Sequence, residues 1–381
     1  METCLSIPES QGSDPKLPME ISEIDTPAVL IDAEKLDRNL RKMANYCTKH
    51  SIALRPHTKT HKMPEIAHMQ MRYGAAGIAV AKLGEAEVMA DAGINDMVVV
   101  YPLWGESKWN RLADLARRVR ISVAMDSLPV AEGISRAAAK AGVEVGIRVE
   151  FDTGFGRCGL PLDHSSIRVA QQVLALPNLR WEGISVYPGH IMGNRAVREH
   201  DLVLENAQLD RLYALLSAAG VPHLRVSGGN TPAALLSHRF HGINEIRPGT
   251  YVFNDRNTVD AEAATYDECA ATVLVTVVST SVAHRAIVDA GSKTLTADTL
   301  LSGERKNHGY VLDHPEIELY DLSEEHGHLR IPEGSKLQIG DRLRVVPNHI
   351  CPCINLQERV YVVSGDQVID QWKVSGRGRV N

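Results

Sequence analysis

Short apolar runs alternate with longer amphipathic stretches over the first two thirds of the chain. The stretches carry apolar residues at helical spacing, and several end in glycine, which is typical of helix C-termini. The runs have the length and composition of strands. Eight of them follow one another, at residues 52–58, 76–81, 96–102, 120–126, 143–152, 180–190, 223–229 and 243–249. Eight consecutive strand–helix repeats predict an α/β fold with a closed (β/α)8 TIM-type barrel.

An open, doubly wound parallel sheet is the alternative arrangement for the same alternation. Such a sheet binds dinucleotides through a G-x-G-x-x-G turn after its first strand, and no such motif follows residues 52–58. The sequence therefore favours the barrel and disfavours a dinucleotide-binding protein.

The pattern changes after residue 260. Runs such as 271–280 and 359–365 are β-branched, turn residues separate them, and helical periodicity is scarce. This texture predicts a C-terminal, mainly β domain over residues 261–381.

The barrel is assigned to residues 25–260. Residues 1–24 are polar and proline-rich and lack the pattern of a signal peptide, which predicts a flexible tail. An early strand at 26–31 precedes the barrel, and it either belongs to the barrel domain or pairs with the β domain.

Composition narrows the class of protein. The 381 residues carry a formal net charge of −6, which gives no electrostatic basis for general nucleic-acid binding. No run of eighteen apolar residues offers a membrane span. The six cysteines are too few and too scattered for a disulfide framework. These features predict a reduced, cytoplasmic protein that binds neither nucleic acid nor membrane.

Polar side chains gather where the predicted strands end, and barrel enzymes carry their active sites at these ends. RPHTKTHK (55–62) follows the first strand, DTGFGRCG (152–159) the fifth and YPGH (187–190) the sixth. SGGNT (227–231) and RPGTY (247–251) follow the last two. This convergent set predicts an active site at that end of the barrel.

The last two loops also predict an anion site. Backbone amides of a glycine-rich turn can cradle an anion at a helix start, and adjacent final strands of a barrel often bind phosphate. The alternative is that the glycines only make tight turns. The residues concerned are Ser227, Gly228, Gly229, Asn230 and Thr231 in one loop and Gly249 and Thr250 in the other.

A lysine facing a phosphate site, without a nucleotide motif, suggests pyridoxal 5'-phosphate. Lys59 is favoured as the lysine that binds the cofactor, because strand alternation puts it at the barrel mouth. The alternative is that Lys59 is a solvated surface lysine without such a role. A desolvated amine near other cations has a lowered pKa and is available for a Schiff base. The surrounding cations are expected to be Arg55, His57, His61 and Lys62, and the rival lysines are Lys62, Lys82 and Lys293.

PNHICPC (347–353) in the β domain suggests a metal site. His349 and Cys351 are two residues apart, and in an extended segment such side chains point the same way. Imidazole and thiolate together suit Zn²⁺, and two protein ligands leave positions for substrate and water. A buried thiol beside a structural histidine is the alternative, and the place of Cys353 stays open.

Several motifs together resemble the D-threonine aldolase and D-serine dehydratase family. They are RPHTKTHK, AKLGEAEVMADAGI, DTGFGRCGL, SGGNTP, RPGTYVFND and VVPNHICPC, in family order over nearly the whole chain after the tail. The family consists of fold-type III pyridoxal-phosphate enzymes with an alanine-racemase-like barrel and a C-terminal β domain. The resemblance implies a homodimer.

The resemblance also implies roles for individual residues. Lys59 forms the Schiff base, Arg157 approaches the phenolic oxygen of the cofactor and Arg247 its pyridine nitrogen, where known aldolases carry another residue. Tyr187 lines the cofactor, and the loops ending at Thr231 and at Tyr251 contact the phosphate. In the β domain, His349 and Cys351 hold a divalent ion, either Zn²⁺ or Mn²⁺. The stretch SEEHGH, with His326 and His328, is either near the site or a hydrogen-bonded turn.

The implied activity is that of a lyase acting on D-3-hydroxy amino acids. Cys351, VAKLGEAEV and VVVYP favour the D-serine dehydratase type, which yields a 2-oxo acid and ammonia. The alternative is retro-aldol cleavage to glycine and an aldehyde. His61 and His190 are candidate bases, each with a structural role as the alternative. An amino-acid racemase and a non-catalytic carrier of the cofactor are more remote alternatives.

Overall fold

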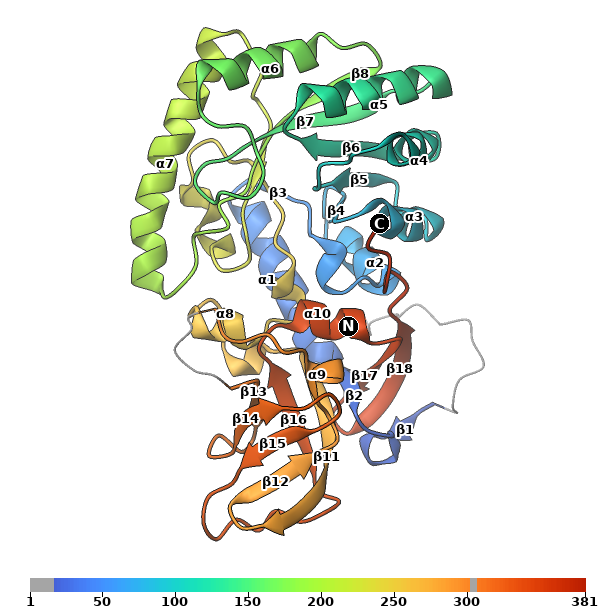
Figure 1. Cartoon of the computed structure of the whole chain (residues 1–381), viewed down its shortest axis with the longest axis vertical. Coiled ribbons are helices and arrows are strands. Elements are labelled where there is room, and N and C mark those ends of the chain that lie inside the picture. The colour runs from blue at the N-terminus through green and yellow to red at the C-terminus, as the bar shows by residue number, and fades with distance from the viewer. Residues whose placement is uncertain (1–16, 302–306) are drawn as a thin grey trace, which may run out of the picture. The chain divides into compact units, whose positions relative to one another are not determined.

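Eight parallel strands form a barrel in the computed structural model, which describes residues 17–301 and 307–381 (Figure 1). Their order in the sheet, β3-β10-β9-β8-β7-β6-β5-β4, keeps every strand beside its neighbours in the chain. A parallel bridge between His57 and Ala79 joins the two edge strands and closes the sheet. The strands are β3 (Ala53–Leu54), β4 (Ile78–Val80), β5 (Asp96–Val99), β6 (Arg120–Met125), β7 (Val145–Phe151), β8 (Leu179–Val186), β9 (Val226–Gly228) and β10 (Glu245–Ile246). The predicted (β/α)8 barrel is thereby confirmed.

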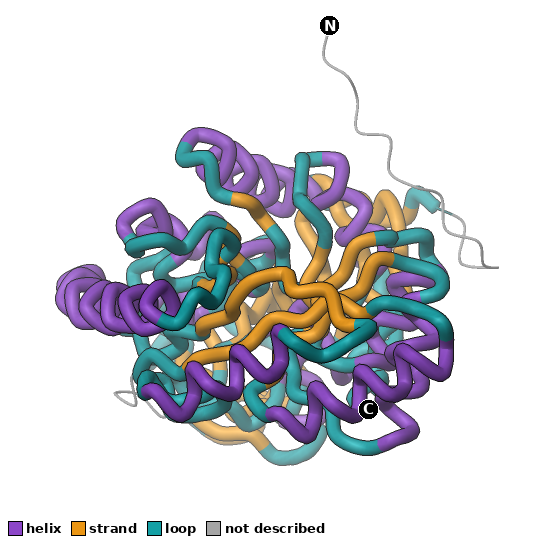
Figure 2. Tube along the Cα trace, turned by 90° about the horizontal axis from the view of Figure 1, so that it is seen from above, coloured by secondary structure: helices purple, strands orange, loops and turns teal. Residues whose placement is uncertain are grey.

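Helices connect the barrel strands, and Figure 2 shows helices around the central strands. They are α2 (Pro64–Arg72), α3 (Leu83–Asp91), α4 (Glu106–Ala116), α5 (Leu128–Ala141), α6 (His164–Leu174) and α7 (Arg195–Ala218). Short 3-10 turns stand in for helices elsewhere, including η2 (Thr58–Thr60), η3 (Ala234–Arg239) and η4 (Thr250–Val252). The helix α5 ends at Gly142 with φ of 67°, the left-handed cap that its terminal glycine predicts.

The second unit is built on antiparallel strands. Six of them close into a ring, because β11 pairs with both β12 and β16 in the order β11-β12-β15-β14-β13-β16. Its C-terminal strands are β11 (Ala271–Val282), β12 (Arg285–Val288), β13 (Gly309–Leu312), β14 (Glu318–Leu322), β15 (Gly327–Arg330), β16 (Arg342–Pro347), β17 (Arg359–Ser364) and β18 (Gln367–Lys373). Short helices α8 (Arg256–Asp260), α9 (Ser292–Leu295) and α10 (Ile350–Leu356) lie between elements of this part of the chain. The predicted mainly β domain is confirmed.

Two early strands belong to the β unit. The strand β2 (Ala28–Asp32) pairs with β11 and β17, and β1 (Met19–Glu20) pairs with β18. Ile21 and Ile24 are buried in the hydrophobic core that these strands share. The tail predicted to end at residue 24 is therefore too long, because β1 and the turn after it are folded. Residues 1–16 of that predicted tail lie outside the described residues.

The chain passes between the two units several times, so each unit consists of several segments. Helix α1 (Ala33–Lys49) leads from β2 into the barrel. Among the described residues, the β unit comprises 17–39, 252–257, 266–301 and 307–377, and the barrel unit comprises 40–251, 258–265 and 378–381. A division at residue 260 is thus a simplification of this arrangement.

Two expectations from composition concern the whole chain. Within the described part of the chain, no helix combines the length and apolarity needed to cross a bilayer. The cysteines at 47, 158, 269, 351 and 353 are all free thiols.

Candidate active site

A cavity of about 260 Å³ lies at the carboxyl ends of the barrel strands. Six of the residues singled out from the sequence line it: His57, Lys59, Arg157, Tyr187, Gly229 and Arg247. The other lining residues are Ala81, Val100, Tyr101, Pro102, Glu150 and Cys158. The ends of seven different strands thus bring a lysine, two arginines and a histidine together around one space.

Lys59 lies in the turn η2 that follows β3. Its backbone N–H donates to Nδ1 of His57 (3.2 Å), and the hydroxyl of Thr58 donates to the carboxylate of Glu85 (2.5 Å). The same carboxylate accepts the N–H of Ala81 (3.1 Å), which ties the turn to the end of β4. The Lys59 side chain is exposed, so the expectation that its amine is desolvated is wrong.

Arg55 and His61, which the sequence predicted as cations around Lys59, have other partners. Arg55 donates to Glu245 (2.9 Å) and to Asp96 (2.6 Å), and it is almost fully buried. His61 is fully buried, and its Nδ1 accepts the N–H of Met63 (3.1 Å). Burial lowers the pKa of His61 to about 3, so the ring is neutral at pH 7. Neither side chain lines the cavity.

His57 and Arg157 are held in defined orientations. Burial, followed by the positive charges of Lys59 and Arg247, holds the pKa of His57 well below its usual value. The guanidinium of Arg157 lies over the ring of Tyr187, 4.4 Å from its centroid, and close to Phe155. Such a cation–π contact fixes the direction of the arginine at the cavity wall.

Each of the two glycine-rich loops has a glycine at a position that requires one. Gly229 has a φ of +84°, in the left-handed region that favours glycine. A Cβ on Gly249 would lie 2.8 Å from Oγ1 of Thr60 and 3.0 Å from the carbonyl oxygen of His57. Atoms of Thr60 and His57 occupy the space that a side chain at position 249 would need, so no larger residue fits there without movement.

Several residues of these loops have structural partners. The amide of Asn230 donates to the carbonyl of Pro188 (2.9 Å) and accepts the N–H of Ala233 (2.8 Å), so its side chain braces the loop after β8. Tyr251 is buried, and its hydroxyl accepts a hydrogen bond from Gln70 (3.2 Å). The other loop residues that do not line the cavity are Ser227, Gly228, Thr231, Gly249 and Thr250.

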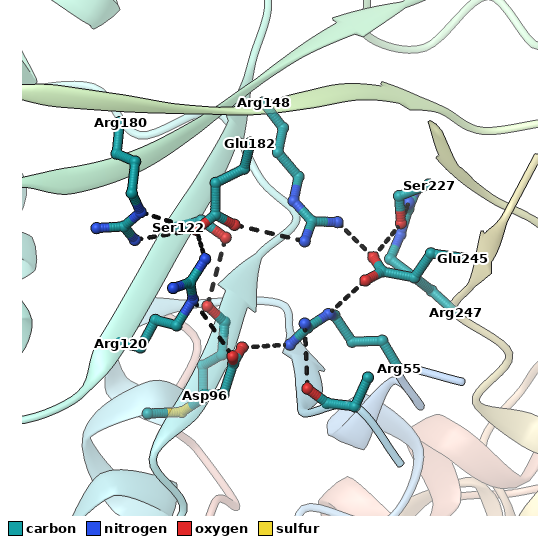
Figure 3. A network of polar contacts seen from close by, with 12 residues as sticks. Arg55, Asp96, Arg120, Ser122, Arg148, Arg180, Glu182, Ser227, Glu245 and Arg247 are labelled. Atoms are coloured by element: carbon teal, nitrogen blue, oxygen red, sulfur yellow. Dashed lines mark hydrogen bonds and ion pairs between the residues drawn. The ribbon is translucent and has the colours of Figure 1, made fainter. Parts of the chain in front are cut away.

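Ser227 and Arg247 are joined below the cavity. The guanidinium of Arg247 donates to the Ser227 hydroxyl and to the carbonyl of Val186 (3.0 Å). Burial lowers the pKa of Arg247 to about 10, and it remains a cation at pH 7. Figure 3 shows that the Ser227 side chain lies between Arg247 and Glu245. Its hydroxyl is therefore part of the barrel interior.

Glu150 is a cavity residue that the sequence analysis missed. It lies on β7, is nearly buried, and shares the cavity with Arg157 and Arg247. Burial raises the pKa of Glu150, and these two arginines oppose that rise. Arg148 and Glu150 are two apart on a buried strand, so both face the barrel interior. Apolar residues are usual at the interior positions of a parallel strand, so the charged residues at 148 and 150 could have indicated Glu150 from the sequence.

His190 does not line the cavity. Its Nε2 lies 3.6 Å from the carboxylate of Glu205 on α7, and that carboxylate is buried. Burial raises the pKa of Glu205 to about 7, against the opposing effect of the Thr153 hydroxyl. The histidine predicted as a base thus has a buried acid as its neighbour.

Replacing Glu205 by glutamine should weaken the pH dependence of stability. The folded protein holds the Glu205 proton up to about pH 7, whereas an unfolded glutamate releases it near pH 4.3. The folded state therefore binds more protons between these values, and the unfolding free energy falls as pH rises through them. At about 1.4 kcal/mol per pKa unit, the loss approaches roughly 3 kcal/mol. Denaturant unfolding at pH 5 and pH 8 should show a smaller difference for Glu205→Gln than for the wild type, and equal differences would contradict the assignment.

His349 and Cys351 are in contact in the β unit. His349 has an extended backbone and begins helix α10, so the expectation of a continuous extended segment is wrong: Cys351 is in the first helical turn. Nδ1 of His349 pairs with the carboxylate of Asp298 (2.9 Å). Burial lowers the pKa of His349, but Cys351, Asp255 and Asp298 together raise it to about 9. A carboxylate that orients an imidazole is a common second partner of metal-binding histidines.

Cys353, His326 and His328 have other partners. The buried thiol of Cys353 donates to the carbonyl of Thr294 (3.2 Å). His328 pairs with the hydroxyl of Ser323 (3.1 Å), and the carbonyl of His326 accepts the Ser323 N–H, as in a hydrogen-bonded turn. Within residues 17–301 and 307–381, no three His, Cys, Asp or Glu side chains form a complete metal site.

Comparisons with known proteins agree with this architecture. The family model for the alanine racemase N-terminal domain matches residues 31–257, and a serine dehydratase domain model matches residues 270–363. The chain is 33% identical to a D-threonine aldolase from Arthrobacter over 97% of this chain and 96% of the relative.

Solved structures extend the similarity to three dimensions. D-threonine aldolase from Filomicrobium marinum matches with a TM-score of 0.90 and 30% identity, over 97% of this chain and 100% of that one. D-threo-3-hydroxyaspartate dehydratase from Delftia matches with a TM-score of 0.84 and 28% identity, over 93% and 98%. A cysteine-to-alanine variant of that dehydratase, in a metal-free form, gives a TM-score of 0.83 and 27% identity, over the same shares. This chain belongs to the D-threonine aldolase and D-serine dehydratase family of fold-type III pyridoxal-phosphate enzymes, and it is a lyase.

Proposed function

We propose that the protein eliminates water from a D-3-hydroxy amino acid, giving a 2-oxo acid and ammonia, with pyridoxal phosphate and a divalent metal ion. The observation that carries the proposal is the donor pair His349–Cys351, an imidazole and a thiol in contact, in a chain whose barrel carries the Lys59 cavity. Both groups required by elimination, a proton acceptor and a cation for the leaving hydroxyl, have residues suited to them.

The cavity residues fit the cofactor. Lys59 would hold its aldehyde, and the loop at Gly229, which lines the cavity, would receive the phosphate. Arg157 and Arg247 would contact the two polar positions of the ring. A guanidinium that is cationic at pH 7 does not readily give up a proton, so Arg247 would keep the pyridine nitrogen neutral.

When bound, the cofactor withdraws electrons from the substrate Cα and so acidifies its proton. Lys59 would take that proton, since its amine is exposed at the cavity and its turn is anchored by Glu85. The neutral ring of His57 lies beside it and adds no further positive charge. With Arg247 at that nitrogen the ring would be a weaker electron acceptor, so assistance to the leaving hydroxyl would be more important.

His349 and Cys351 would hold the divalent ion through Nε2 and Sγ, while Asp298 keeps Nδ1 of His349 engaged. A divalent ion with open positions acts as a Lewis acid on a substrate hydroxyl. The thiol must be a thiolate to bind it, so the ion is expected to bind more tightly as pH rises.

One observation supports elimination and another supports retro-aldol cleavage. Cys351 supports elimination, because a cysteine-to-alanine variant of a similar dehydratase is described in a metal-free form. Overall identity supports the second candidate, cleavage to glycine and an aldehyde, because the Arthrobacter relative at 33% is a D-threonine aldolase. Both reactions begin with the same substrate class.

Product analysis tests the proposal. The holoenzyme with Zn²⁺ or Mn²⁺ is given D-serine, D-threonine and D-3-hydroxyaspartate in turn. We expect equal amounts of ammonia and 2-oxo acid from at least one substrate. Glycine and an aldehyde in place of these products would establish the second candidate, and conversion of D- to L-enantiomer alone would contradict both.

A further inference from the structure

A cluster of buried charges fills the barrel interior below the cavity. Its members are four charged residues and one serine from β3, β7, β9 and β10 or the residues just after these strands, and they are at most 7% exposed: Arg55, Arg148, Ser227, Glu245 and Arg247. Figure 3 shows the side chains of Arg55, Arg148 and Ser227 at the carboxylate of Glu245, and Ser227 in turn accepts a hydrogen bond from Arg247. Buried charges are costly unless they are paired, so the cluster needs a reason beyond packing.

Glu245 is held on both of its carboxylate oxygens. Arg148 donates to Oε1, and Nε of Arg55 donates to Oε2 at 2.9 Å. Burial raises the pKa of Glu245, but Arg148 and Arg55 outweigh that effect and hold it far below the usual range. The carboxylate is therefore ionised at pH 7 and fixed in place from two sides of the barrel.

Ser227 connects this carboxylate to Arg247. The Ser227 hydroxyl donates its one proton to Oε1 of Glu245 (2.6 Å), which leaves its lone pairs for the guanidinium of Arg247. The second arm of Arg247 donates to the carbonyl of Val186 (3.0 Å). The direction of the hydroxyl, and hence the position of the guanidinium, is set by Glu245.

We propose that Glu245, acting through Ser227, is the positioning residue that aims Arg247 at the ring nitrogen of the cofactor. The inference rests on the proposed function only in that Arg247 contacts that ring. Without this support the guanidinium has one fixed partner, Val186, and its contact with the ring loosens. The electron distribution of the ring then changes even where Lys59 stays linked to it.

The test compares Ser227→Ala with Ser185→Ala in the holoenzyme. Ser185 is the register partner of Ser227 on the neighbouring strand β8 and is equally buried. Among the described residues its hydroxyl has no hydrogen-bond partner, so it is a matched control. The measurements are the absorption spectrum of the bound cofactor, borohydride trapping at Lys59, and kcat and KM for D-serine.

We expect Ser227→Ala to shift the cofactor absorption band and keep trapping at Lys59. Because a buried hydrogen bond to a charged group is lost, kcat should fall roughly tenfold with KM almost unchanged. Ser185→Ala should match the wild type in all three measurements. An unshifted band in Ser227→Ala would overturn the inference, as would the same shift in both variants.

A second variant serves if Ser227→Ala does not fold. Ser227→Cys keeps a side chain of the same shape with a somewhat larger atom, but it offers only a weak donor and acceptor, so it should show the same spectral shift. An unshifted band in a folded Ser227→Cys holoenzyme would overturn the inference. Absence of lyase activity in the wild type would count against the proposed function alone, since the spectra report on the contact between Ser227 and Arg247 without turnover.

Discussion

Lys59→Ala is expected to abolish the covalent link to the cofactor and nearly all lyase turnover. One positioned proton acceptor contributes about 10²–10⁴ in rate, and here the same side chain also holds the cofactor. The loss should be seen as disappearance of the reducible imine absorption and of borohydride labelling at the peptide that contains residue 59. Turnover of D-serine should fall by at least that range.

Two lysines serve as controls for this substitution. Lys82 lies over the ring of Tyr101 at 3.2 Å from its centroid, and Lys293 pairs with Glu324 (2.7 Å) in the β unit. Alanine at either position should leave borohydride labelling at Lys59 intact. A Lys59→Ala protein that still forms a reducible imine at another lysine would contradict the assignment.

His349→Ala and Cys351→Ala are expected to remove metal-dependent turnover while leaving the cofactor spectrum intact. A Lewis acid supplies several kcal/mol to the departure of a hydroxyl, which corresponds to about 10²–10³ in kcat. Dialysis of the wild-type holoenzyme against a chelator should give the same loss, and added Zn²⁺ or Mn²⁺ should reverse it. The variants should not recover at the ion concentration that restores the wild type.

Cys353→Ala is the matched control for the thiol. Its sulfur contacts the carbonyl of Thr294 and is fully buried, so its loss should affect stability and not the response to metal. Asp298→Asn should need about 10–100-fold more metal for half-maximal turnover, as second partners of metal ligands do. Turnover that survives both chelation and His349→Ala would rule out a metal at this place.

The barrel was predictable because its signal is local. Each strand is a short apolar run beside a helix with its own periodicity, and consecutive strands are neighbours in the sheet, so chain order equals spatial order. The sheet to which β2 belongs could not be predicted in this way. Its partners, β11 and β17, are far along the chain, and no local pattern states which edge a strand will join.

The place of Lys59 at the cavity was predictable from its position at a strand end, whereas its surroundings were not. The strand β3 has only two residues, and the chain then turns through η2, so strand alternation does not extend to residues 58–61. Arg55 is consequently paired in the barrel interior and His61 is buried, although both are close to Lys59 in sequence. The partner of His190 is equally remote, since Glu205 belongs to the following helix.

The interleaved β unit has a consequence for how the chain folds as it is made. The ribosome releases β1 and β2 first, yet their partners β11, β17 and β18 emerge only after the whole barrel. Domains fold as units during synthesis, so the barrel can fold once all its strands have emerged. At that time β2 is still an apolar strand without a partner on either edge. We therefore expect the nascent chain to expose the unpaired β2 until its last strands leave the exit tunnel.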